Sequence, residues 1–151
     1  MDLIAIVETW LNIVEKDNKV IKDLTPADYK FVHLPRKSRR GGRVGLVYRS
    51  SFKVVVNQQF LDVDISSSGN STKLVIIYRP PTSKKNKHSY DDFLVEFTGF
   101  IEHYVLMTTR FAIVGDFNIH WDVPSDNNVK RFADLLESLN IIQHVHAPTH
   151  S

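Results

Sequence analysis

Short apolar runs and alternating stretches predict several strands along the chain, and two segments have helical spacing instead. Residues 3–7, 74–78 and 111–114 are continuous apolar runs, which are typical of strands buried on both faces. Further strands are predicted at 29–34, 44–48, 52–56, 60–65 and 141–145. The two runs on either side of Arg49-Ser50-Ser51 predict a hairpin.

Two amphipathic helices are predicted in the second half of the chain. Ser89-Tyr90-Asp91-Asp92 has the shape of a capping box, with Asp in place of the usual Glu, and helical spacing continues to about Leu106. The second helix covers residues 129–139 and ends at Asn140. Turn residues lie at 66–71, and Pro80-Pro81 ends the preceding strand. This order of elements predicts an α/β fold with a mixed sheet.

Composition narrows the class of protein. The 151 residues fit one domain, residues 1–151, and 42% hydrophobic residues suffice for a core. The chain has no cysteine, which excludes disulfides, thiolate metal sites and a cysteine nucleophile. No apolar run approaches the length of a membrane span, and Met1-Asp2-Leu3 lacks the basic start of a signal peptide. We therefore expect an intracellular protein with no membrane partner.

The positive charge of the chain is concentrated in one segment. The formal net charge is +2, but residues 36–87 contain twelve Lys or Arg against Asp62 and Asp64, which gives this segment +10. The densest clusters are Arg36–Arg43 and Lys84–Lys87. Such a segment favours a polyanionic partner, because neutralised phosphates release counterions. Solvated basic loops with no partner are the alternative.

Polar groups that suit metal-assisted chemistry follow the three apolar runs. Glu8 follows the first run, Tyr78-Arg79 ends the second, and Gly115-Asp116-Phe117-Asn118 ends the third. Reactive groups of α/β proteins commonly lie just beyond the carboxyl ends of strands. Carboxylate, amide and hydroxyl oxygens are the ligands that Mg²⁺ prefers, with water and substrate phosphate completing its shell.

Each of these residues also has a purely structural interpretation. Glu8 suits the first turn of a helix, and Asp116 and Asn118 are ordinary turn residues. Tyr78 suits a core position with its hydroxyl satisfied, and Arg79 suits the surface beside the prolines.

Several motifs occur in a family-like order. They are Glu8-Thr9-Trp10-Leu11, Arg40-Gly41-Gly42-Arg43-Val44-Gly45, Tyr78-Arg79-Pro80-Pro81, Gly115-Asp116-Phe117-Asn118 and Pro148-Thr149-His150. With this set the chain resembles the endonuclease/exonuclease/phosphatase superfamily, most closely the apurinic-type endonuclease domain of LINE-type (non-LTR) retrotransposons. The resemblance implies mixed β-sheets packed as a sandwich with flanking helices.

The resemblance also implies roles for individual residues. Glu8 matches the acid that binds Mg²⁺ or Mn²⁺, and Tyr78 matches the tyrosine that contacts the scissile phosphate. Asp116 matches the aspartate that orients or deprotonates the attacking water, and Asn118 matches the asparagine that holds the phosphate or nucleophile. Arg79 is an additional candidate for phosphate binding. No small-molecule cofactor is expected.

The family pattern extends beyond both ends of this sequence. Relatives have an earlier strand ending in a metal-site Asn and a later Asp-His pair, and neither is found between Met1 and Ser151. The chain therefore matches a partial domain, with weak or no activity expected on its own. A reverse transcriptase domain in the same polypeptide is the implied partner, and chromosomal DNA as substrate implies a nuclear setting. A phosphatase or lipid phosphodiesterase of the same superfamily and a non-catalytic nucleic-acid-binding remnant are the alternatives.

Overall fold

The chain folds into two compact units. The computed structural model describes residues 2–11, 15–34, 43–57, 61–67, 69–81, 89–107 and 110–145. Unit 1 combines Met1–Arg79 with Thr109–Phe117, and unit 2 combines Pro80–Thr108 with Asn118–Ser151. The assignment of residues 1–151 to one partial domain stays a prediction.

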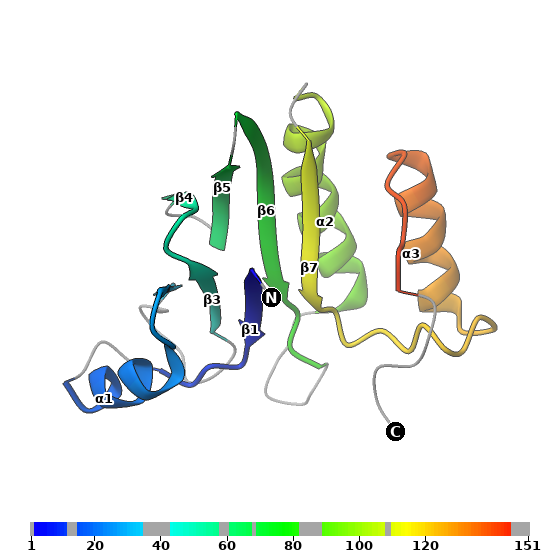
Figure 1. Ribbon diagram of the computed structural model, residues 1–151. Helices are drawn as coiled ribbons and strands as arrows, with labels where there is room; N and C mark the ends of the chain where they lie inside the picture. Colours follow the sequence, from blue (N-terminus) through cyan, green and yellow to red (C-terminus); the bar gives the residue numbers. More distant parts are fainter. Residues whose placement is uncertain are drawn as a thin grey trace. The chain divides into compact units, whose positions relative to one another are not determined.

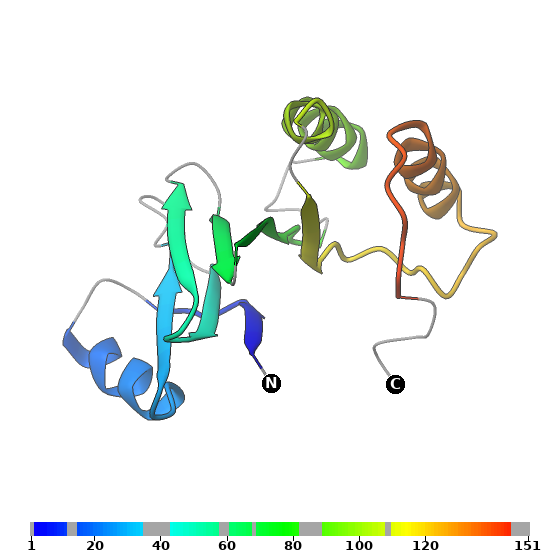
Figure 2. The same cartoon turned by 45° about the horizontal axis from the view of Figure 1, so that its top comes forward.

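The first sheet of unit 1 contains three antiparallel strands. β3 (Val44–Arg49) lies between β1 (Leu3–Val7) and β2 (Tyr29–His33), which confirms the strands predicted at these places. Helix α1 (Glu15–Leu24) lies on the β2 side of this sheet (Figure 2). The sequence pattern missed this helix, because it is mostly polar and Val20, Ile21 and Leu24 are its only apolar residues.

The second sheet of unit 1 is mixed, as the sequence predicts. Its order is β4 (Lys53–Asn57), β5 (Leu61–Ser67), β6 (Asn70–Tyr78) and β7 (Phe111–Asp116). The first three strands pair antiparallel, whereas β6 and β7 run parallel, side by side in Figure 1. Parallel pairing needs a crossover connection, and the segment that contains α2 supplies it.

The predicted hairpin around Arg49-Ser50-Ser51 is wrong. β3 pairs with β1 and β2, whereas β4 pairs with β5 in the other sheet. The turn stays tied to the first sheet, because Arg49 N donates to Asp2 O (3.1 Å) and Ser50 N donates to Asp28 O (2.7 Å). A short polar spacer between two apolar runs does not distinguish a hairpin from a change of sheet, since both place apolar side chains in the same core.

The core of unit 1 lies between its two sheets. Leu46 from the first sheet packs with five buried residues of the second, Leu61, Val63, Ile65, Leu74 and Ile76. Half-buried residues of both sheets surround this cluster, so the two sheets form a sandwich.

None of the three strands predicted to be fully buried is buried along its whole length. β6 comes nearest, because it is buried over 73–76 and half-buried at Ile77 and Tyr78, whereas Ala5 of β1 and Ala112 of β7 are exposed. The difference follows from strand order, because β1 and β7 each lie at the end of their sheet in the described part of the chain.

Unit 2 contains α2 (Tyr90–Val105) and α3 (Asn127–Ser138). The predicted capping box is confirmed, because Ser89 Oγ accepts from Asp92 N (3.1 Å) and Ser89 N donates to Asp92 Oδ2 (2.9 Å). Phe93 and Phe97 of α2 meet Phe132 of α3 with ring centroids 5.9 and 5.2 Å away. Neither these nor any other described helix is long and apolar enough to cross a bilayer.

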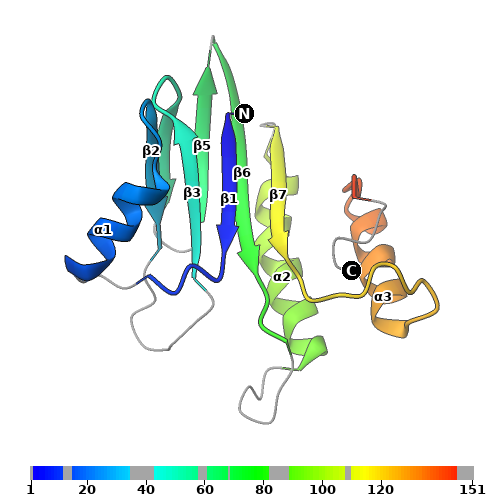
Figure 3. The same cartoon turned by 60° about the horizontal axis from the view of Figure 1, so that its bottom comes forward.

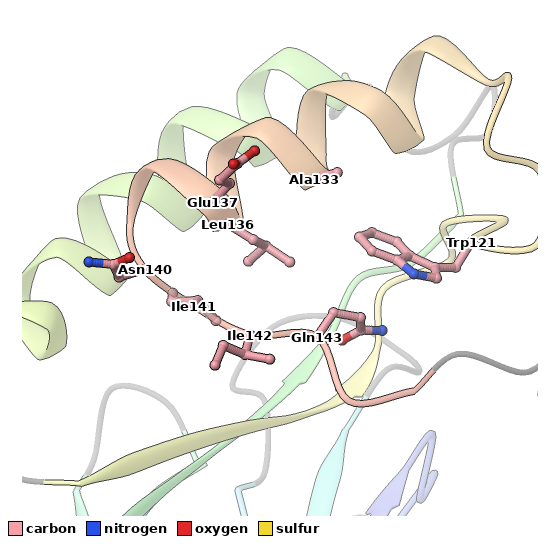
Figure 4. Close-up of a pocket in the computed structure, with 8 residues that line it drawn as sticks. All are labelled: Trp121, Ala133, Leu136, Glu137, Asn140, Ile141, Ile142 and Gln143. Atoms are coloured by element: carbon pink, nitrogen blue, oxygen red, sulfur yellow. The ribbon is translucent and has the colours of Figure 1, made fainter.

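The strand predicted at residues 141–145 is absent, and this segment runs without regular structure after α3. Asn140 has a positive φ of 55°, and Ile141 N donates to Leu136 O (2.9 Å). The segment turns back along α3 and leaves an open apolar pocket of about 330 Å³ between Leu136, Ile141 and Trp121 (Figure 4). Ile142 is exposed, so the apolar residues that suggested a strand do not all face a core.

Candidate active site

Four of the five predicted site residues lie at one end of unit 1, namely Glu8, Tyr78, Arg79 and Asp116. β6 and β7 are parallel, with Tyr78 opposite Asp116, and β1 contacts both strands. The arrowheads of β1, β6 and β7 point the same way in Figure 3. The residues at these strand ends therefore leave the sandwich on the same side, although β1 belongs to the other sheet.

Glu8 and Tyr78 are in direct contact. The Tyr78 hydroxyl donates a hydrogen bond to Glu8 Oε1 across a sequence separation of 70 residues. Glu8 is exposed and Tyr78 is half-buried. The interpretation of Glu8 as a first-turn helix acid is wrong, because Glu8 follows β1 and α1 begins only at Glu15.

Arg79 joins the segments that follow β6 and β7. Its backbone N–H donates to Asp116 O (2.8 Å), and its Nη1 donates to Phe117 O (3.0 Å). The side chain is half-buried, so it does not extend freely into solvent beside the prolines. Arg79 thereby fixes the backbone that carries Asp116, and phosphate binding by Arg79 stays a prediction.

Gly115 allows β7 to approach β6 closely enough to place Asp116. Its φ is +146°, and a Cβ atom at this position would lie 1.7 Å from Ile77 O. No other residue type fits there without displacing backbone. The first position of the Gly-Asp-Phe-Asn motif is therefore set by the contact between two strands.

Asn118 belongs to unit 2. It is exposed and has a positive φ of 47°, a conformation that asparagine tolerates well. The cluster of predicted site residues within unit 1 thus contains Glu8, Tyr78, Arg79 and Asp116. The role of Asn118 stays a prediction from its motif.

The segment after β1 has an unusual backbone. Glu8 and Trp10 both have left-handed conformations, with φ of 54° and 53°. Thr9 between them is fixed to the neighbouring strand, because its N–H donates to Arg43 O (3.1 Å). The sequence pattern gave Trp10 no role, and its position two residues after Glu8 was the available signal.

A buried cation lies near this segment. Arg43 is 8% exposed at the start of β3. Burial and then the Arg43 charge hold the pKa of His33 below its usual range, and Asp17 opposes this shift. The Phe31 ring lies over Gly45, where a Cβ atom would be 2.8 Å from the ring carbons.

Most of the basic clusters, namely residues 36–42 and 84–87, and the Pro148-Thr149-His150 motif lie outside the described residues.

The donor atoms at this end of unit 1 fit a hard divalent cation in kind. Glu8 and Asp116 supply carboxylates and Tyr78 a hydroxyl, which matches the all-oxygen preference of Mg²⁺ or Mn²⁺. Among the described residues, no three His, Asp or Glu side chains are grouped closely enough to hold a metal ion. Water and substrate oxygens would therefore supply most of the ligands, as is usual for Mg²⁺.

Solved structures of TDP2 have a fold similar to that of this chain. A TDP2 structure from Caenorhabditis elegans matches with a TM-score of 0.54 and 14% identity, covering 83% of this chain and 44% of that chain. D. rerio TDP2 in complex with a single-strand DNA product matches with a TM-score of 0.52 and 14% identity, covering 95% and 53%. A humanized D. rerio TDP2 gives a TM-score of 0.55 at 14% identity, covering 95% and 55%.

No protein-family model and no curated protein sequence matches this chain. The chain spans about half the length of the TDP2 chains that it resembles. At this level of identity the similarity establishes the fold. The two sheets and three helices found among the described residues therefore form part of an endonuclease/exonuclease/phosphatase fold.

Proposed function

We propose that this chain is part of a divalent-metal-dependent phosphodiesterase that cleaves DNA. The observation that carries this proposal is the contact between Glu8 and Tyr78, with Asp116 directly opposite Tyr78 on the next strand. Three residues from three separate motifs meet where the resemblance requires a metal ligand, a phosphate contact and a residue that positions water.

The proposed roles follow the chemistry of phosphodiester hydrolysis. A bound Mg²⁺ or Mn²⁺ supplies charge neutralisation on the phosphate oxygens. Glu8 would hold the ion, and the Tyr78 hydroxyl would donate a hydrogen bond to the phosphate. Asp116 orients or deprotonates the attacking water. Asn118 is included on its motif alone, as the group that holds the phosphate or nucleophile.

DNA is the proposed substrate because the sequence concentrates its positive charge in one segment. Residues 36–87 have a formal charge of +10, and Arg43 of this segment is bonded through its backbone to Thr9, next to Glu8. The similarity to a TDP2 structure that contains DNA supports the same substrate class. The +10 segment favours a nucleic acid over a lipid headgroup or an inositol phosphate.

We further propose that the full-length protein is a LINE-type retrotransposon polyprotein. Its reverse transcriptase domain would use the nicked strand end as a primer, and the protein would act in the nucleus. The ordered motifs of the sequence support this proposal. The reading frame that encodes the chain tests it: an in-frame reverse transcriptase downstream is expected, and an unrelated domain there would overturn the assignment.

Nicking of supercoiled plasmid tests the catalytic proposal. We expect slow nicking that requires Mg²⁺ or Mn²⁺, disappears with EDTA and is lost in Asp116→Asn. Inositol phosphates and a phospholipid bilayer serve as competing substrates, and faster hydrolysis of either would overturn the choice of DNA. Nicking that persists unchanged in Asp116→Asn would show that the proposed site does not catalyse it.

A non-catalytic nucleic-acid-binding protein is the second candidate. It is favoured by the lack of a group of three metal-ligating side chains among the described residues. This candidate predicts salt-dependent DNA binding that survives Glu8→Gln and Asp116→Asn, together with no metal-dependent nicking by the unaltered chain.

A further inference from the structure

Trp10 is an exposed aromatic residue immediately next to the candidate site. Trp10 is 61% exposed to solvent. Burying a tryptophan side chain would remove about 150–250 Å² from water. The other strongly exposed large hydrophobic residues in the described part of the chain are aliphatic or methionine. Single exposed aliphatic residues are common on protein surfaces, whereas an exposed indole forgoes a larger gain from burial.

The backbone at Trp10 is also unusual for its residue type. Three of the five non-glycine residues with positive φ in the described segments are Asp28, Asn118 and Asn140, which tolerate this conformation. The other two are Glu8 and Trp10, for which it is unfavourable. Unfavourable backbone conformations gather at functional sites, where the surrounding structure imposes them.

The structure imposes this conformation through Thr9. The Thr9 N–H donates to Arg43 O, and the Thr9 side chain lies over Gly45 on β3. A larger residue than glycine at position 45 would meet the Phe31 ring as well as Thr9. Thr9 is thus held against the sheet, with Glu8 and Trp10 on either side of it in exposed positions.

We propose that Trp10 is a stacking platform for an unpaired base of a DNA strand bound at the candidate site. This inference rests on the proposed function and names its substrate class more closely. Two residues span at most about 7 Å, so Trp10 lies within about two nucleotide steps of Glu8. An exposed indole beside a site that binds DNA suits an unpaired base, because bases stack on aromatic rings.

The sequence that leads into Arg43 is strongly basic, which favours a nucleic acid over a protein partner. Thr9 is bonded to Arg43, the last residue of the basic cluster Arg36–Arg43. This cluster contains five Lys or Arg and no acid. A hydrophobic peptide could use only the exposed indole. A DNA strand could use the indole for its bases and the basic sequence for its phosphates.

Fluorescence of two single-Trp variants tests the inference. The chain has two tryptophans, so Trp121→Phe leaves Trp10 as the only indole and Trp10→Phe leaves Trp121 as a matched control. Both 151-residue variants are titrated with a thymidine homopolymer and with a duplex of equal length. The titrations contain EDTA, which prevents metal-dependent hydrolysis. Anisotropy of a labelled strand measures binding independently of either tryptophan.

We expect the single strand to quench Trp10 emission over the concentration range in which anisotropy rises, and to leave Trp121 emission unchanged. Trp10→Leu should weaken single-strand binding by about tenfold, as loss of one stacked base does, and Trp10→Phe by much less. Duplex binding should change little in either variant. Circular dichroism of each variant verifies folding, and the quenching result does not depend on altering Trp10.

A strand that binds by anisotropy without changing Trp10 emission would overturn the inference, as would equal binding by Trp10→Leu. If the chain nicks DNA but Trp10 emission does not change on binding, the stacking inference is refuted and the proposed function stands. Quenching without nicking would refute catalysis and leave stacking intact. Failure of any DNA to bind at low salt would overturn both.

Discussion

At the scale of single residues, the site depends on one close backbone approach and one side-chain contact. Gly115 lets β7 lie against β6, and the Tyr78 hydroxyl donates to Glu8. These two features place a carboxylate beside a hydroxyl at the end of the sandwich. Each feature can be removed by one substitution, and the same substitution at another position of the chain serves as its control.

Gly115→Ala should destabilise the protein by about 3 kcal/mol or more, because its Cβ atom would overlap Ile77 O and its φ is unfavourable for alanine. Gly99→Ala is the control, since a Cβ there has no neighbour within 4 Å and lies in α2. Gly99→Ala should raise the free energy of unfolding by up to about 1 kcal/mol, because alanine favours a helix more than glycine does. Urea unfolding measures both, and equal stability of the two variants would contradict the account of Gly115.

Tyr78→Phe should slow metal-dependent nicking by about 100-fold, because it removes a donor proposed to act on the phosphate. Stability should change by only about 1 kcal/mol, since the hydroxyl is at an exposed contact. Tyr48→Phe alters a residue packed against the core of the same unit and should leave the nicking rate unchanged. Equal rates for the two variants would remove Tyr78 from the mechanism.

At the scale of elements, the sequence predicted which segments are strands better than it predicted their partners. The strands β1 to β7 and the helices α2 and α3 follow from apolar periodicity and the Ser89 capping box. The sequence did not predict the change of sheet between β3 and β4. Apolar periodicity and turn residues are local signals, whereas the sheet that a strand joins depends on distant partners such as Asp2 and Asp28. The segment at 141–145 shows the converse, an apolar run without a neighbouring strand among the described residues.

The candidate site was predicted from the same local signals, with similar limits. The ends of three apolar runs indicated Glu8, Tyr78 and Asp116, and their meeting at one end of unit 1 needed the parallel pairing of β6 with β7. The strained backbone at Trp10 has no sequence signature, since it results from the Thr9–Arg43 bond.

A buried ion pair links β5 and β6. Lys73 Nζ lies 2.8 Å from Asp64 Oδ1 and 3.3 Å from Asp62 Oδ1, and the side chains of Lys73 and Asp62 are 11% and 9% exposed. Lys73→Met should therefore destabilise by about 3–5 kcal/mol, because it leaves a buried carboxylate without its cation. Asp62→Asn combined with Lys73→Met should recover part of this loss. Full stability of Lys73→Met in urea would contradict the assignment.

The same pair sets a pH dependence at the alkaline end. Burial lowers the pKa of Lys73, but the hydrogen bond to Asp64 and the charge of Asp62 outweigh it, so the pKa is raised above 10.5. A group with a raised pKa contributes stability that is complete below the unfolded value and is lost as pH rises through the folded value. The free energy of unfolding should fall above about pH 10.5, and less so in Lys73→Met.

At the scale of the whole molecule, the uneven charge is the feature that most directly suggests DNA. The +10 segment lies in a chain of net charge +2, so the remainder is acidic and would repel phosphates. Binding should accordingly depend on residues 36–87 rather than on total charge.

Duplex DNA affinity should fall steeply with salt, by about 10³ between about 50 and 200 mM if six phosphates are neutralised. Replacing Lys84, Lys85 and Lys87 with Ser should make the salt dependence shallower, by about 0.9 in the log–log slope for each phosphate that the variant no longer neutralises. Replacing Lys16, Lys19 and Lys22 of α1 removes the same charge outside the basic segment and should leave the slope unchanged. Equal effects of the two sets would mean that only net charge matters.

The central claim is that Glu8 and Asp116 act on the same hydrolytic step, and a double-mutant cycle on the rate of Mg²⁺-dependent plasmid nicking tests it most directly. Groups that act as a unit have non-additive effects on rate. The account predicts that Glu8→Gln with Asp116→Asn nicks no more slowly than the slower of the two single variants. A double variant slowed by the product of the two single effects would contradict it, because the two carboxylates would then act independently.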